Sequence, residues 1–184
     1  MDSTLIAAPS STKNREKQRD PDAHQTKKGN QWYFGYKTHI GVDADTGLVH
    51  HVKTTAANVS DKSTVPALLD GTEETVHGDS GYLGAEKRED AILRNTQGRS
   101  IKYQINLRPS QLKKLNTSAK VQARQTEHDK SSVRSKVEHV FAVVKRIFGF
   151  RKTRYRGLRK QEAHSNFLFA LANLYLAGKR GLLA

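Results

Sequence analysis

Residues 131–149, SSVRSKVEHVFAVVKRIFG, have the pattern of one amphipathic helix. The apolar face of this helix consists of five residues at helical spacing, Val133, Val137, Val140, Val144 and Ile147. Beside that face, Arg134, Glu138 and Lys145 lie within about 40° of one another, because each residue turns the helix by roughly 100°. A carboxylate between two cations suits a rigidly held metal or phosphate site, although an i,i+4 ion pair on a solvated helix border has the same spacing.

The segments around this helix alternate between strand-like and helical patterns. Strands are expected at residues 2–8, 32–42, 48–55, 75–77 and 99–107, and helices at residues 60–69, 85–94 and 161–177. Asp45-Thr46-Gly47 predicts a hairpin turn between the second and third strands. The last helix is apolar on most sides, which predicts burial. This order favours a mixed α/β sheet over a helical bundle or a β-sandwich.

Two polar stretches interrupt this order. Residues 8–31 are charge-rich and lack periodicity, so we expect a long mobile loop there. Residues 108–131 are polar and weakly helical, and residues 98–126 contain seven basic residues and no acidic one. We therefore expect a basic insertion before the helix that carries Glu138.

The charge balance points to a polyanionic partner. The 184 residues include 32 lysines and arginines against 18 aspartates and glutamates, a formal net charge of +14, which makes nucleic acid the leading candidate. An anionic membrane surface would require a basic amphipathic helix with an aromatic or leucine-rich face, and no segment has that pattern. From Lys145 to Lys160, eight of sixteen residues are basic and none is acidic. The aromatic residues within this run are typical of nucleic-acid contact, with a plain solvated surface as the alternative.

Several classes of protein are excluded by what the sequence lacks. The absence of cysteine excludes thiolate zinc sites, disulfides and thiol nucleophiles. The first twelve residues have neither the basic leader nor the long apolar core of a secretory signal. The longest apolar tract, FLFALANLYLAG from Phe167, is too short to span a bilayer. We therefore expect a soluble cytoplasmic protein with no membrane partner.

Two aspartates stand where strands could project them. Asp79 follows a short apolar strand in the turn Gly78-Asp79-Ser80-Gly81, where it could also serve only as a turn or helix cap. Asp2 opens the first strand and carries little weight alone. With Glu138, these carboxylates could converge on a pair of divalent cations, and Mg²⁺ prefers such oxygen ligands. Two ions about 3.5 to 4 Å apart would activate the attacking oxygen and stabilise the leaving oxygen of a phosphodiester.

The histidines and the aromatic cluster are expected to be structural. His50 and His51 are adjacent in a predicted strand and should point to opposite faces, so they should not chelate one ion together. His139 lies about 100° around the helix from Glu138. Trp32, Tyr33 and Phe34 are expected to lie in the sheet core rather than to stack on bases.

Five strings in this sequence resemble insertion-sequence transposases of the IS5 group, within the wider IS4-like DDE class. They are DSTLIAAPSSTKN from Asp2, HQTKKGNQWYFGYKTHIGVDADTG from His24, TTAANVSD from Thr54, HGDSGYLG from His77 and VRSKVEHVFAVVKRIFGF from Val133. The most specific part is Arg134-x3-Glu138-x6-Lys145, which is similar to the signature around the glutamate of that class. The resemblance implies an RNase H-like fold, a mixed five-stranded sheet flanked by helices. It also implies hydrolysis of a phosphodiester at the transposon ends, followed by strand transfer into target DNA.

The resemblance also implies roles for individual residues. Asp2, Asp79 and Glu138 would be the catalytic triad and would hold two Mg²⁺ ions, with Mn²⁺ as a substitute. Arg134 and Lys145 would contact DNA phosphates. Further DNA contacts are expected from the basic run, from Arg146, Arg151, Lys152, Arg154 and Arg156. The expected partners are transposon ends, target DNA and further copies of the chain in a synaptic complex associated with the nucleoid.

Two departures from the pattern shape the alternatives. The class signature often has a tyrosine three residues before the arginine, and Ser131 stands there. The resemblance begins at Asp2, so residues 1–184 are expected to be a catalytic domain with its first strand truncated at the N-terminus and its upstream DNA-recognition domain absent. One alternative is a non-catalytic DNA-binding fragment that interferes with a full-length transposase. Another is an RNase H-like nuclease of repair or recombination.

Overall fold

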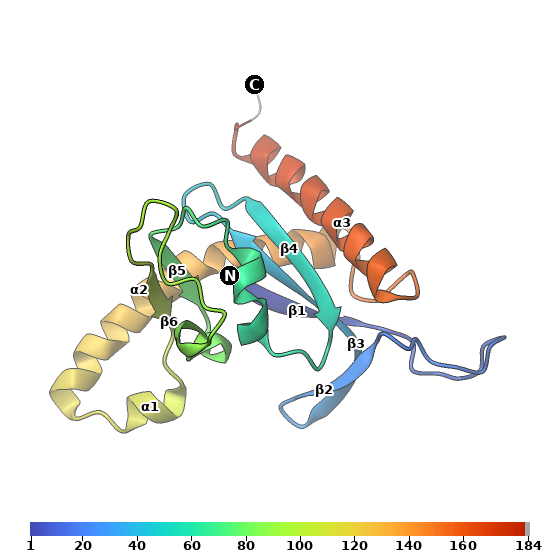
Figure 1. Ribbon diagram of the computed structural model, residues 1–184, viewed down its shortest axis with the longest axis horizontal. Helices are drawn as coiled ribbons and strands as arrows, with labels where there is room; N and C mark the ends of the chain where they lie inside the picture. Colours follow the sequence, from blue (N-terminus) through green and yellow to red (C-terminus); the bar gives the residue numbers. More distant parts are fainter. Residues whose placement is uncertain (183–184) are drawn as a thin grey trace.

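The computed structural model describes residues 1–182, and its largest sheet has four antiparallel strands (Figure 1). These strands are β1 (Asp2–Ala7), β2 (His24–Lys28), β3 (Gln31–Val42) and β4 (Val49–Ala56). β3 is the longest strand and pairs with all three others. The turn between β3 and β4 has the predicted form, because Gly47 has a φ of +67° and its N–H bonds the carbonyl of Asp43 at 2.9 Å.

A second, parallel sheet lies beside the start of β1. It consists of β5 (Thr75–Gly78) and β6 (Lys102–Ile105). The main-chain nitrogen of Met1 donates a hydrogen bond to the carbonyl of His77 at 2.8 Å, which joins β1 to β5. The structure thus has a four-stranded and a two-stranded sheet in place of the single five-stranded sheet expected from the sequence.

The longer helices pack on this framework. α2 (Thr117–Ala142) continues into the π-helical turn η4 (Val143–Ile147), and α3 (Leu158–Lys179) lies along β4 (Figure 1). Four shorter elements complete the fold, namely η1 (Asp61–Leu68), η2 (Ser80–Tyr82), η3 (Ala85–Lys87) and α1 (Pro109–Lys113). No helix within residues 1–182 is long and apolar enough to cross a membrane.

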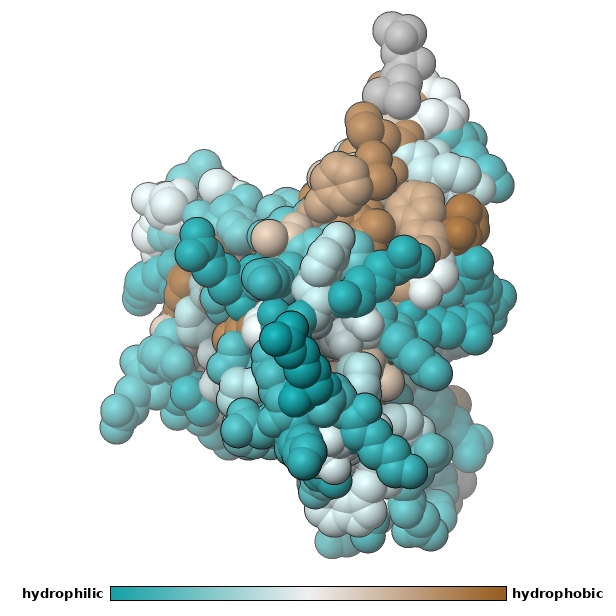
Figure 2. Space-filling view, turned by 90° about the vertical axis from the view of Figure 1, so that its right-hand side faces the viewer, coloured by the Kyte–Doolittle hydropathy of each residue, from teal (hydrophilic) through white to brown (hydrophobic). Residues whose placement is uncertain are grey.

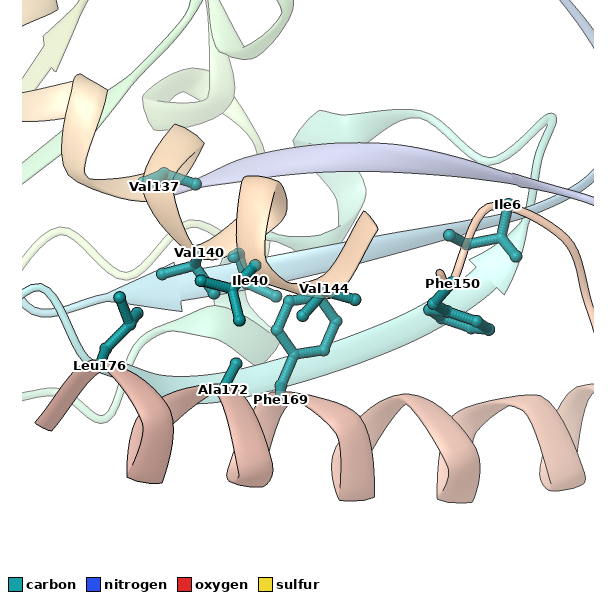
Figure 3. Close-up of a cluster of buried hydrophobic side chains, with 10 residues drawn as sticks. Ile6, Ile40, Val137, Val140, Val144, Phe150, Phe169, Ala172 and Leu176 are labelled. Carbon is teal, nitrogen blue, oxygen red and sulfur yellow. The ribbon is translucent and has the colours of Figure 1, made fainter. Parts of the chain in front are cut away.

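The apolar face of α2 packs against the large sheet and α3 (Figure 3). Its cluster contains Ile6, Ile40, Val137, Val140, Val143, Val144, Phe150, Phe169, Ala172 and Leu176. Ile147, predicted on the same face, is 53% exposed. A π turn contains more residues per turn than an α-helix, so Ile147 is rotated away from the line of the preceding valines.

A second apolar cluster lies under η1 and the small sheet. It consists of Met1, Val65, Leu68, Val76, Tyr82, Ala85, Ile101 and Ile105. Since Met1 belongs to this cluster and Ile6 to the other, β1 spans both halves of the interior. The first residues of β1 are thereby fixed next to the end of β5.

Several predicted elements differ from the observed ones. The expected loop 8–31 contains β2, and the expected helix 85–94 is only the short turn η3. Residues 117–130, expected as an insertion, belong to the same helix as Glu138, and the Asn116 side chain caps its start by accepting from the Ala119 N–H at 2.9 Å. The prediction that the last helix is buried on most sides was wrong. Phe167, Leu171 and Leu174 are exposed, and Figure 2 shows apolar side chains gathered over α3.

Candidate active site

Asp2 and Asp79 line the same cavity, of about 460 Å³, which is bordered mainly by β1 and the β2–β3 hairpin. Asp2 is the first residue of β1, and Asp79 directly follows β5. The bond between Met1 and His77 explains this proximity, because it holds the two strand ends side by side. The structure therefore brings together the two aspartates that the sequence singled out.

Asp79 has both of the roles considered from the sequence. Its Oδ1 accepts from the N–H of Gly81 at 2.8 Å, which caps the turn η2. A Cβ at Gly81 would lie 2.9 Å from that oxygen, so the turn requires glycine to bring the backbone this close. One carboxylate oxygen holds the turn, and the side chain still borders the cavity.

The environment of Asp2 disfavours an isolated negative charge. Burial raises the pKa of Asp2, and the nearby Asp79 carboxylate adds to that increase. The Ser3 N–H, which donates to Asp2 Oδ1 at 2.7 Å, and the Arg134 guanidinium oppose it. A cation bound between the two aspartates would favour the ionised form of both.

Glu138 lies next to this cavity but not within it. Its side chain is 59% exposed and accepts from Arg134 Nη2 at 3.3 Å, which is the predicted i,i+4 pair. It lines an adjoining hollow of about 440 Å³ together with Lys145, Arg146 and Arg151. Asp2, Asp79 and Glu138 do not form a group whose ligand atoms all lie within 4.8 Å of one another.

The two cations of the predicted signature connect Glu138 with the aspartates. Arg134 lies close enough to Asp2 to influence its charge. Lys145 lines both the aspartate cavity and the Glu138 hollow, as does Arg151. Burial lowers the pKa of Lys145, and the neighbouring cations Lys28 and Arg151 add to this, while Asp2 opposes it.

The remaining basic residues of the run fall into two groups. Arg146, Arg151, Lys152 and Arg154 are exposed, as a DNA contact requires. Arg156 is half-buried, pairs with Glu16 and donates to the carbonyl of Arg19 at 2.6 Å. Arg156 therefore holds the loop after β1 against the start of α3 and is not exposed for DNA as the other four are.

Asp61 is a third carboxylate of the aspartate cavity that the sequence prediction missed. It is the first residue of η1 and accepts from Lys37 Nζ at 2.8 Å and from Ser3 Oγ at 3.1 Å. The string TTAANVSD ends on this residue, but an aspartate after Ser60 also fits the first turn of a helix. Only the fold brings η1 to β1 and the turn after β5.

The β2–β3 hairpin supplies another missed set of residues. Lys27, Lys28 and Tyr33 line the aspartate cavity. The prediction that Trp32 lies in the core was wrong, because its side chain is 63% exposed at the hairpin end, with Lys27 Nζ 6.0 Å from the ring centroid. The hairpin thus brings two lysines and the Tyr33 ring to the aspartate cavity and presents the Trp32 ring to solvent beside Lys27.

A separate polar cluster contains His50, Asp70 and Glu73, whose ligand atoms lie within 4.8 Å of one another. Both Glu73 oxygens already accept from backbone N–H groups, of Asp70 and Gly71, at 2.9 Å. The expectation that His50 and His51 point apart was wrong, since their Nδ1 atoms are 2.8 Å apart. A β-bulge at Gly41 and Val42 leaves His50 without a partner in β3 and breaks the alternation of side chains.

Comparison with known families gives one clear result. The family model described as "Transposase DDE domain" matches residues 1–174, which leaves out only the last ten residues of the chain. No solved structure matches the chain. The family description implies a polynucleotidyl transferase or nuclease that acts on DNA with a divalent metal. This match over almost the whole length shows that the chain belongs to the transposase DDE domain family.

Proposed function

We propose that this chain is the catalytic domain of an insertion-sequence transposase of the IS5 group, which cleaves transposon ends and joins them to target DNA. The observation that carries the proposal is the cavity in which Asp2 and Asp79 face Lys145 and Arg151. Carboxylates for a metal and cations for a phosphodiester are thereby combined at one place. The proposed assembly is a homo-oligomer on the DNA ends, associated with the nucleoid.

An RNase H-like sheet is part of this proposal. Backbone hydrogen bonds between neighbouring strands set the order β4, β3, β1 in the large sheet. In the small sheet, β5 pairs with β6. One hydrogen bond, from Met1 to His77, links the two sheets and supports the proposed order β4, β3, β1, β5, β6. β2 is an extension of this sheet at the far end of β3.

The donor set fits a divalent cation such as Mg²⁺, or Mn²⁺ in its place. Asp2 and Asp79 present carboxylate oxygens in one cavity, and their mutual repulsion contributes to the raised pKa of Asp2. Asp2 and Asp79, with Glu138 from the adjoining hollow, would hold two such ions. When bound, the ions would supply activation of the attacking oxygen and stabilisation of the leaving oxygen.

The residues of the chain position the DNA for two successive displacements. In the first, a water oxygen attacks the phosphorus at the transposon end, and the bond to the 3′ oxygen breaks to give a free 3′ hydroxyl. In the second, that hydroxyl attacks a phosphorus of the target strand and displaces its 3′ oxygen. Lys145 and Arg151 would hold the phosphate oxygens during both steps, and Arg134 would orient Glu138 through their ion pair.

Substitution of Glu138 tests this function directly. We expect Glu138→Gln and Asp79→Asn to lower Mg²⁺-dependent cleavage of a duplex carrying the inverted repeats by at least about 100-fold, since each removes a proposed metal ligand. DNA affinity should stay within about twofold of the unsubstituted chain. Glu89→Gln, at an exposed position away from the cavity, is the matched control and should cleave normally. Cleavage by Glu138→Gln at the normal rate would contradict the role of Glu138, and equal cleavage of a scrambled duplex would favour a general nuclease.

One observation favours a second candidate, a non-catalytic DNA-binding domain. Glu138 is largely exposed, is paired with Arg134 and does not form, with the two aspartates, a group whose ligand atoms all lie within 4.8 Å of one another. If this candidate is correct, DNA binding will depend steeply on salt and not on Mg²⁺, and Asp79→Asn will leave every DNA-dependent readout unchanged.

A further inference from the structure

Asp61 occupies a position that its ion pair with Lys37 does not explain. It borders the same cavity as Asp2 and Asp79, so three carboxylates line that cavity, and without a bound cation their ligand atoms do not all lie within 4.8 Å of one another. A Cβ at Gly81 would lie 2.9 Å from Asp79 Oδ1 and 3.4 Å from Asp61 Oδ2, which places both oxygens around one point. The charges of Asp61 and Asp79 at such a separation repel each other unless a cation lies between them.

The two carboxylate oxygens of Asp61 differ in their contacts. Oδ1 accepts from Lys37 Nζ at 2.8 Å and from Ser3 Oγ at 3.1 Å, and His39 Nδ1 lies 3.6 Å away. Oδ2 faces Gly81 and Asp79 and accepts no hydrogen bond from any residue within the described part of the chain. A carboxylate with one oxygen fixed by donors and the other left open is the arrangement by which outer residues orient a metal ligand.

The buried Tyr82 hydroxyl provides an independent indication that something binds here. Tyr82 is fully buried, and within the described residues its hydroxyl has no hydrogen-bond partner. Burial raises the pKa of Tyr82, the charges of Asp61, Asp2 and Asp79 add to this increase, and the nearby Ser3 side chain opposes it. A buried hydroxyl without a partner is unfavourable, and a water molecule carried by a cation in the cavity would satisfy it.

We propose that Asp61 is a further carboxylate ligand of the divalent cation at Asp2 and Asp79, and that Lys37 and Ser3 fix its orientation. This inference rests on the proposed function for the identity of the site. The inference goes beyond the proposed function because it concerns metal binding by the chain alone, without DNA.

The test is a titration of the full chain with Mn²⁺ in the absence of DNA, measured by isothermal titration calorimetry. We expect Asp61→Asn to lower Mn²⁺ affinity by at least about tenfold, comparably with Asp79→Asn. Asp61→Glu should recover part of the loss, because it restores a carboxylate. Asp70→Asn, in the separate His50 cluster, is the control and should leave binding at the aspartate cavity unchanged.

The double variant Lys37→Met/Asp61→Asn keeps the result interpretable if loss of Asp61 alone leaves Lys37 uncompensated. If Asp61 is a ligand, the double variant folds and still binds Mn²⁺ weakly. If Asp61 only neutralises Lys37, the double variant binds Mn²⁺ normally and the inference is overturned. Binding that Asp79→Asn abolishes and Asp61→Asn does not change also overturns it. Binding that depends on both residues in a chain that never cleaves DNA would support the inference and contradict the proposed function.

Discussion

At the residue scale, the sequence indicated Asp2, Asp79 and the ionisable residues of α2 but missed Asp61 in η1. The pair of Arg134 and Glu138 follows from helical spacing alone, because positions on one α-helix have a fixed angular relation. Asp61 could not be found in this way, since its neighbours Asp2 and Asp79 come from distant parts of the chain. No local pattern determines which helix start faces which strand end.

The buried histidine beside Asp61 gives a pH prediction at the same scale. Burial lowers the pKa of His39 from 6.5 to about 4, Asp61 opposes this shift and Lys37 adds to it. The unfolded chain takes up this proton near pH 6.5 and the folded chain only near pH 4, so the free energy of unfolding should fall as the pH is lowered between these values. The loss should reach up to about 3 kcal/mol.

Urea unfolding of the chain and of His39→Gln at pH 7 and pH 4.5 checks this expectation. Glutamine can keep a hydrogen bond to Thr55, whose hydroxyl lies 2.9 Å from His39 Nε2. The variant should lose less stability on acidification than the unsubstituted chain. Equal losses in both proteins would show that other groups are responsible for the acid sensitivity.

At the element scale, the β2–β3 hairpin shows why a polar segment escapes prediction as a strand. The string HQTKK lacks apolar alternation, and β2 forms because Gly29, at a φ of +61°, reverses the chain onto β3. The hairpin then carries Lys27 and Tyr33 to the aspartate cavity and leaves Trp32 exposed at its end. The short helix predicted at 85–94 failed for the opposite reason, since packing supports the local propensity only at Ala85 and Ile92, and residues 87–90 between them are exposed.

We expect Trp32→Ala to weaken binding of single-stranded or frayed DNA ends by about tenfold, because an exposed ring beside lysines can stack on a base. Thermal stability should change little, as the side chain is 63% exposed. Trp32→Phe should recover most of the affinity. Leu93→Ala, which removes a half-exposed apolar side chain elsewhere, is the control for unspecific effects in a DNA-binding titration. Unchanged DNA affinity in Trp32→Ala would exclude the hairpin from the DNA interface.

At the scale of the whole molecule, two apolar clusters meet along β1, and the aspartate cavity lies beside that strand. The sequence predicted the α/β class, most strands and the main helix, because these depend on local periodicity. It did not predict the division of the strands into two sheets or the exposed side of α3. Both features depend on which elements pack against each other. The net charge of +14 gives the whole molecule an electrostatic field that favours DNA.

That field does not make every basic residue a DNA contact. The salt dependence of DNA binding can separate basic residues that contact DNA from those that stabilise the fold. Arg154 is exposed, whereas Arg156 is held by Glu16 and by the carbonyl of Arg19. We expect Arg154→Gln to reduce the slope of log affinity against log salt by about 0.9, the value for one phosphate contact on duplex DNA. Arg156→Gln should keep that slope and lower the melting temperature, because it releases the loop after β1. Fluorescence anisotropy over a series of salt concentrations, with thermal melts of both variants, gives the two readouts. If Arg156→Gln lowers the slope at an unchanged melting temperature, Arg156 contacts DNA and the loop is held by other residues.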